Sequence, residues 1–213
     1  GLADLPGELA EKANQLKVSC QIEDALKGDG EHAEDFLREM MAQDPANSTF
    51  HDALQRLHSG SSMSGRRLVD FYRDLQKSYP NEPAFLLQLA RAYCNASKDT
   101  LAVVQFRKLV QISPTAAFYA ELAHTYIRLN KLPDAQKAID SALELDPESL
   151  PAQVVRVRLL IEQKELATAK EHAETAQSKA DGELSTWLSQ VVEALAEDKA
   201  PEAKLLGQMP NLF

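Results

Sequence analysis

The sequence predicts an all-α protein built from repeated helix-turn-helix units, and three observations lead to this fold class. Prolines recur at gaps of 35, 34 and 33 residues, at Pro45, Pro80, Pro114 and Pro147. Within the intervals, apolar residues follow the 3.6-residue period of two amphipathic helices that a short polar break separates. The composition, 44% apolar and 26% charged with 8 Gly and 10 Pro, is typical of a helix-rich protein. A fixed period of this length indicates stacked helix pairs.

Two central intervals align without a gap. Sliding residues 83–115 onto 116–148 superposes Leu89 on Leu122, Ala90 on Ala123, Tyr93 on Tyr126, Ala102 on Ala135 and Phe106 on Ile139. Small side chains allow the two helices of a unit to approach closely, and the large ones fill the space beside that contact. We therefore expect Ala123 and Ala135 to be buried where the two helices touch.

The N-terminal part of the chain predicts two irregular units. In the first, a helix over 5–27 begins near Pro6 and ends at Gly28, and residues 1–13 extend it beyond the repeat. A second helix, His32–Gln43, precedes Pro45. The next unit has a short helix, Phe50–His58, and a longer one, Arg66–Tyr79. The Ser/Gly-rich connector between them, Ser59–Gly65, is either a mobile flap or a tolerated surface loop.

The C-terminal part predicts one further unit and a cap. Residues 150–183 keep the helix-pair pattern, with Asp181 and Gly182 supplying the turn in place of proline. A helix over 184–196, which contains Trp187, is expected to cover the last unit, because an open end would expose apolar surface. A short helix and a tail over 197–213 complete the chain.

The repeated residues resemble those of the tetratricopeptide repeat family. Residues 116–148 present the family pattern as Tyr119, Leu122, Ala123, Tyr126, Ala135, Ile139, Ala142 and Pro147. The resemblance implies a right-handed α-solenoid of about four to five repeats, with degenerate outer repeats and a C-terminal capping helix. The implied units are 14–48, 49–82, 83–115, 116–149 and 150–183, followed by the cap at 184–196. The stretch DPESLPAQ…LATAKEHAETAQ is also weakly similar to bacterial envelope repeat proteins of biofilm and polysaccharide export.

Charge and motif content argue against several classes of function. A net charge of −9 disfavours nucleic-acid binding, and no apolar run reaches membrane-spanning length. His51 and His58 are seven residues apart, about 10.5 Å along a helix, which is too far to share a metal. We expect each histidine to be solvated or in a groove. No catalytic motif is present, so we expect no enzyme activity, no metal and no cofactor. We also expect a soluble protein of the cytoplasm or the periplasm. A signal or membrane anchor upstream of this sequence is left open.

The resemblance also implies a binding site, because positions 2, 5, 9, 12 and 13 of each family repeat point into a concave groove. The residues predicted to bind a peptide or protein partner are Leu87, Arg91, Asn95, Ala120, His124, Arg128, Val154 and Arg158. Arg91, His124 and Arg158 share position 9. Leu87, Ala120 and Val154 are expected to form an apolar floor, and the basic residues predict an acidic partner segment. The carboxylate clamp of chaperone-binding repeats is absent, since Leu87 and Arg91 occupy two of its positions.

Three functions remain open at this point. The first is a non-catalytic scaffold or adaptor that binds a partner segment in the groove. The second is a structural spacer or self-association module of a larger envelope, secretion or polysaccharide-export assembly. The third is an accessory domain of an enzyme whose catalytic part lies elsewhere.

Overall fold

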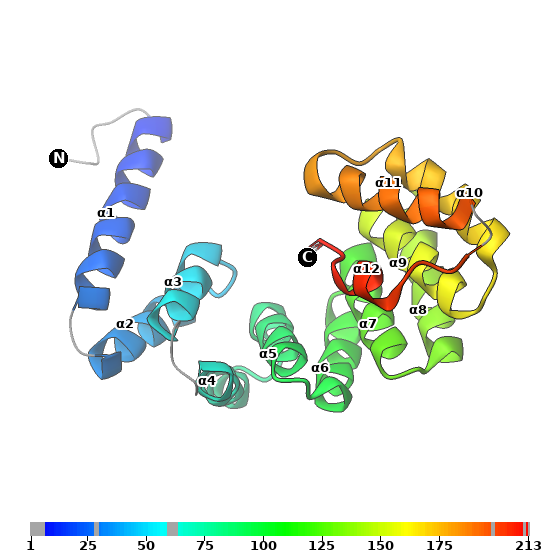
Figure 1. Cartoon of the computed structure of the whole chain (residues 1–213). Helices are drawn as coiled ribbons and strands as arrows, with labels where there is room; N and C mark the ends of the chain where they lie inside the picture. Colours follow the sequence, from blue (N-terminus) through cyan, green and yellow to red (C-terminus); the bar gives the residue numbers. More distant parts are fainter. Residues whose placement is uncertain (1–6, 28–29, 59–63, 197–198, 211, 213) are drawn as a thin grey trace. The chain divides into compact units, whose positions relative to one another are not determined.

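The computed structural model describes residues 7–27, 30–58, 64–196, 199–210 and 212, and within these ranges all regular secondary structure is helical (Figure 1). The all-α prediction is therefore confirmed. In chain order the helices are α1 (Gly7–Lys27), α2 (Gly30–Gln43), α3 (Ser48–His58), α4 (Ser64–Ser78), α5 (Pro83–Asn95), α6 (Asp99–Ile112), α7 (Ala116–Arg128), α8 (Leu132–Leu145), α9 (Leu150–Glu162), α10 (Leu166–Gln177), α11 (Gly182–Ala196) and α12 (Ala203–Gly207).

The chain divides into two compact units, residues 1–92 and 93–213, and the division falls inside α5. Each unit is described by itself. In the first unit, α3 packs against α1, α2 and α4. Its core contains Leu37 and Met41 of α2, Leu54 of α3, and Tyr72 and Leu75 of α4, all fully buried. Of the predicted connector Ser59–Gly65, residues 59–63 lie outside the described residues, whereas residues 64 and 65 already belong to α4.

Two histidines of α3 contradict the expectation that lone histidines are solvated or in a groove. His51 is buried, and its Nε2–H donates to the carbonyl of Pro45 at 2.8 Å. Because a carbonyl only accepts, Nδ1 is left to accept from the hydroxyl of Tyr72 at 2.9 Å. His58 is also buried, with Nε2 3.2 Å from Oε1 of Glu34. Burial lowers the pKa of both rings, so both are neutral at pH 7, and His51 links the turn at Pro45 to Tyr72 of α4.

In the second unit, consecutive helices from α6 to α11 pack against one another. Ala123 of α7 and Ala135 of α8 are fully buried, and these two helices make an extensive contact. The predicted burial of both alanines is therefore confirmed. Towards the C-terminal end, apolar residues of α9, α10, α11 and α12 form one continuous core cluster, which includes Val154, Trp187 and Leu206.

The turn that links the two helices of a pair has the same backbone geometry three times. Ser97, Asn130 and Lys164 each adopt a left-handed conformation, with φ of 55°, 55° and 65°. The next residue's N–H returns to the preceding helix, from Lys98 to Tyr93 O, from Lys131 to Tyr126 O and from Glu165 to Leu160 O, at 2.8, 2.9 and 2.9 Å. These are Schellman caps, which satisfy helix carbonyls and usually contain glycine at the left-handed position.

Replacing Lys164 by glycine is expected to stabilise the protein by about 1 kcal/mol. A left-handed conformation is strained for residues with a Cβ, and this gain exceeds the added entropy of glycine in the unfolded chain. The side chain of Lys164 is exposed. Thermal unfolding should show a midpoint about 2–4 °C higher for Lys164→Gly. Lys164→Ala is the matched control and should leave the midpoint unchanged; an equal rise in both variants would contradict the backbone explanation.

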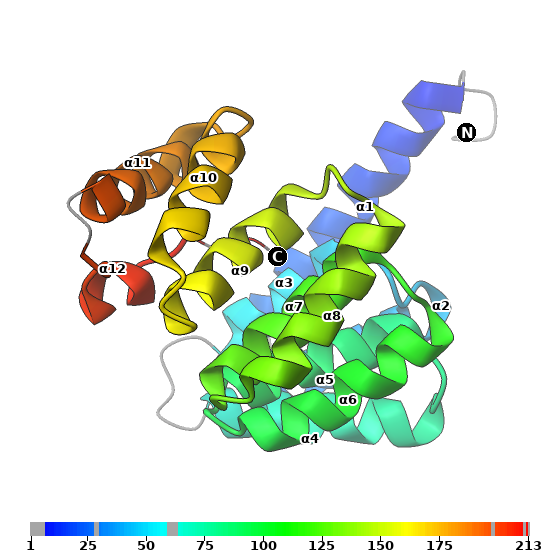
Figure 2. The ribbon, with the colours of Figure 1, turned by 90° about the vertical axis from the view of Figure 1, so that its right-hand side faces the viewer.

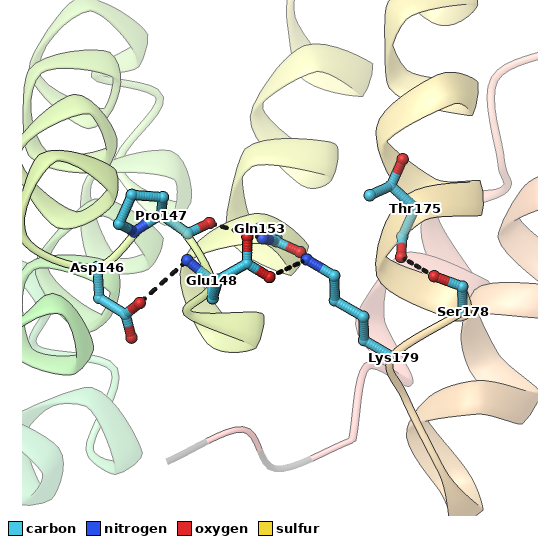
Figure 3. Close-up of polar contacts among 7 residues, drawn as sticks. All are labelled: Asp146, Pro147, Glu148, Gln153, Thr175, Ser178 and Lys179. Atoms are coloured by element: carbon cyan, nitrogen blue, oxygen red, sulfur yellow. Dashed lines mark hydrogen bonds and ion pairs between the residues drawn. The ribbon is translucent and has the colours of Figure 1, made fainter.

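The turn between α8 and α9 shows how the periodic proline is accommodated (Figure 3). The side chain of Asp146 accepts from the N–H of Glu148 at 3.0 Å, and the carbonyl of Pro147 accepts from Nε2 of Gln153 at 2.8 Å. Glu148 in turn pairs with Nζ of Lys179, which follows α10, at 2.5 Å. This ion pair links two successive turns, although its exposure limits its contribution to stability.

Candidate partner-binding face

The predicted site residues are distributed over the two units. Leu87 and Arg91, both half-buried on α5, belong to the first unit. The second unit contains the other six, which are Asn95, Ala120, His124, Arg128, Val154 and Arg158. A single basic wall that includes Arg91 therefore stays a prediction. The second unit brings together α7 and α9, and we call the side of these helices that carries His124, Arg128 and Arg158 the inner face.

In the second unit, the residues expected to form the apolar floor of the groove are buried. Ala120 and Val154 have no exposed surface. Val154 belongs to the same core cluster as Leu206 of α12, a residue more than 50 positions further along the chain. A partner cannot reach either side chain in this conformation, which differs from the expectation that they line an accessible groove.

Arg128 has partners within its own unit. Its Nη2 lies 3.0 Å from Oδ1 of Asp99, the first residue of α6, and donates to the carbonyl of Cys94 at 3.2 Å. Asp99 is well placed at the N-terminus of α6, where a carboxylate interacts favourably with the helix dipole. Arg128 thus fastens the end of α7 to the turn between α5 and α6, and a large part of its charge is compensated by Asp99.

His124 is largely buried between these basic groups. Burial first, and then the charges of Arg158 and Arg128, lower the pKa of His124 to about 4. The ring is therefore neutral at pH 7 and contributes no positive charge to the inner face. The sequence suggested that His124, at position 9 of its repeat, would contribute a positive charge. Its buried environment instead keeps the imidazole ring neutral.

Arg158 contacts the C-terminal segment of the chain. Its Nη1 donates to the carbonyl of Leu206 at 3.4 Å. Nearby, the indole Nε1–H of Trp187 donates to the carbonyl of Leu205 at 2.8 Å. Burial lowers the pKa of Arg158, but a guanidinium remains charged at neutral pH. Residues 199–210 and 212 are here called the tail, and its helix α12 packs against α11 (Figure 2).

Sequence reasoning placed a short helix in the tail but missed its contact with Arg158. The available signal was the apolar series Leu205, Leu206, Met209 and Leu212, which has no place in the repeat pattern. Together with Trp187, these residues belong to or border the terminal core cluster. An apolar series outside the repeat suggests a segment that packs back on the fold.

Among the helices that the structure describes, none is long and apolar enough to cross a membrane. Within the same described ranges, no three or more His, Cys, Asp or Glu side chains gather in an arrangement that suits a metal ion.

Comparison with known proteins identifies the fold. The chain matches no protein-family model and no curated protein sequence. Among solved structures, a tetratricopeptide repeat protein from Parabacteroides merdae aligns over 91% of this chain and 82% of its own, with 18% identity and a TM-score of 0.59. A thermophilic TPR protein of Thermus thermophilus aligns over 87% of this chain and 98% of its own, with 15% identity and a TM-score of 0.56.

A third similar structure contains a bound partner. The TPR2AB domain of yeast Sti1, solved in complex with pHSP90, aligns over 80% of each chain, with 18% identity and a TM-score of 0.51. TM-scores above 0.5 over most of the chain establish a shared fold, and identities below 20% show nothing beyond the fold. The chain therefore has the fold of the tetratricopeptide repeat proteins.

Proposed function

We propose that the chain is a non-catalytic interaction module that binds a segment of a partner protein on its inner face, with an acidic side chain of the partner meeting Arg158. The fold supports a binding role, since the similar Sti1 domain was solved with pHSP90. The acidic preference rests on the guanidinium of Arg158, which is only partly used within the chain.

The observation that carries this proposal is that the guanidinium of Arg158 has few hydrogen-bond acceptors within the described part of the chain. A guanidinium has five N–H donors, and the hydrogen bond from Arg158 to Leu206 is long, at 3.4 Å. Its Nε is buried, and no hydrogen-bond partner for it occurs in the described part of the chain. A carboxylate has two acceptor oxygens and can accept from a guanidinium in a bidentate manner. An acidic side chain would therefore satisfy Arg158 better than the Leu206 carbonyl does.

A display library of random twelve-residue segments tests this proposal. The wild-type protein is expected to enrich segments rich in Asp and Glu, and their retention should fall as salt rises, because exposed charge pairs are screened. Arg158→Gln should reduce binding of the enriched segments at least tenfold. The matched control is Arg66→Gln, which makes the same change at an exposed position of α4 and should bind like the wild type.

Circular dichroism of each variant should show that helicity is retained. If the same acidic segments bind Arg158→Gln and the wild type equally, Arg158 is not the contact and the proposal is wrong.

A further inference from the structure

The tail contacts the repeats mainly through main-chain carbonyls and apolar side chains. Its two described hydrogen bonds to α9 and α11 end on the carbonyls of Leu205 and Leu206. Leu206 is 7% exposed, and Leu205, Met209 and Leu212 are partly buried against the terminal core cluster. Main-chain carbonyls are present in every polypeptide, so this mode of contact is available to any segment with suitably spaced apolar residues.

The helix of the tail depends on this contact. Helix α12 has five residues, Ala203–Gly207, and a helix of this length is not stable alone in water. The carbonyls of its last turn have no partners among residues 203–207, although the carbonyl of Leu205 also accepts from the N–H of Gln208, which follows α12, at 3.1 Å. Trp187 and Arg158 supply donors to two of them, and the positive charge of Arg158 also suits a helix C-terminus. The tail therefore folds as it docks, in the manner of a bound peptide.

Two hollows open to solvent border the contact between the tail and α11. A hollow of about 460 Å³ is lined by Gln190, Glu193 and Ala194 of α11 and by Glu202, Lys204, Leu205 and Gln208 of the tail. A second hollow of about 290 Å³ lies between Glu183, Thr186, Trp187 and Gln190 of α11 and Gln208 and Pro210 of the tail. Both hollows are open to solvent, so the tail contacts α11 through its buried apolar residues and leaves the edges of the contact solvated.

We propose that the tail is a resident ligand of the partner site and competes with the partner for Arg158 and Trp187. This inference rests on the proposed function. It also specifies the chemistry of the partner segment: one helical turn with two adjacent large apolar residues, a further apolar residue a few positions later, and an acidic side chain. The helical turn with two adjacent apolar residues and the later apolar residue are both features of the tail. The acidic side chain is not, and its carboxylate would pair with Arg158 more strongly than the Leu206 carbonyl does.

The covalent link between the tail and the rest of the chain determines how strongly the tail competes with a partner segment. A segment joined by a short linker has an effective concentration of about 1 mM at its own site. If the free tail binds with a Kd of about 100 μM, about nine molecules in ten hold it at any moment. An added segment then binds about tenfold more weakly than it would to an empty site, because its apparent Kd is the intrinsic Kd divided by the competent fraction.

Cleavage of the folded chain tests the inference. A protease recognition sequence is inserted between Lys199 and Ala200, both exposed, and the whole chain is folded before it is cut. Trp187 is the one tryptophan in the sequence, so its fluorescence reports on the tail contact. After cutting and dilution, we expect the 200–213 fragment to dissociate, the emission to shift to longer wavelength, and the helicity of the remaining chain to persist.

A synthetic peptide of residues 200–213 then measures affinity. It should bind the cut protein saturably and bind the uncut protein at least tenfold more weakly. The matched control peptide carries Leu206→Asn and should not bind, because it places an uncharged polar group in an apolar contact and offers Arg158 no carboxylate. A fragment that stays bound through dilution and gel filtration would show that the tail is a structural element. A loss of helicity on its removal would show the same, and either result overturns the inference.

Failure of this inference and failure of the proposed function give different results. Acidic library segments that bind cut and uncut protein equally, and that still require Arg158, would uphold the proposed function and overturn the competition by the tail. A tail peptide that rebinds while no acidic segment displaces it would overturn the acidic-partner function and the competition that rests on it.

Discussion

Replacing Trp187 by alanine is expected to destabilise the second unit by about 3–5 kcal/mol, the range for removal of a buried tryptophan. The indole is 4% exposed and packs in the cluster that joins α9, α10, α11 and Leu206. Its removal leaves a cavity, and the carbonyl of Leu205 also loses its hydrogen bond from Nε1. Denaturant unfolding followed by circular dichroism should show the transition of the second unit at a clearly lower concentration.

Trp187→Phe separates packing from hydrogen bonding. Phenylalanine retains much of the apolar volume but has no N–H, so the expected loss is smaller, about 1–2 kcal/mol. The chain has two compact units, and the transitions are therefore fitted separately. An unfolding curve of Trp187→Ala that coincides with that of the wild type would contradict the burial of this side chain.

Acidification should weaken the fold through His124. The pKa of His124 is about 4 in the folded protein, compared with 6.5 for an unperturbed histidine. Between these values the unfolded chain binds more protons than the folded one, so the free energy of unfolding falls as pH decreases from about 6.5 towards 4. From pH 7 to pH 4.5 this difference amounts to about 2–3 kcal/mol.

The variant His124→Gln isolates this contribution. Burial also lowers the pKa of His51, His58 and His172, so the wild-type protein should lose stability with acid at a slope that several groups share. The stability of His124→Gln should fall less between pH 7 and pH 4.5, by about the amount that His124 contributes. Equal slopes for variant and wild type would show that the ring titrates normally in the folded state.

The sequence predicted best those features that depend on periodic local packing. Ala123 and Ala135 were expected at a helix contact because they recur in register, and both are buried. The left-handed turns could not be predicted from residue type, because Ser97, Asn130 and Lys164 share no common propensity for that conformation. There the geometry follows from the fixed length of the preceding helix and the need to cap its carbonyls.

The site was less predictable, since its properties arise from residues distant in sequence. Arg128 has the residue type of a ligand contact, but its ion-pair partner Asp99 lies 29 positions earlier, and only the folded structure shows that the two meet. His124 similarly loses its expected charge through burial. The role of the tail was hidden because its apolar residues follow no repeat and contact α9 and α11 from far along the chain.

The way in which the tail is held affects how its sequence can vary over evolutionary time. Its two described hydrogen bonds to α9 and α11 involve carbonyls, which substitution does not remove, while Lys204, Gly207 and Gln208 are exposed. Exposed positions such as these can therefore accept substitutions, provided that the side chains at positions 205 and 206 remain apolar. Relatives would then diverge quickly in the tail and retain its contact, so alignment of tail sequences would underestimate how widely the contact is shared.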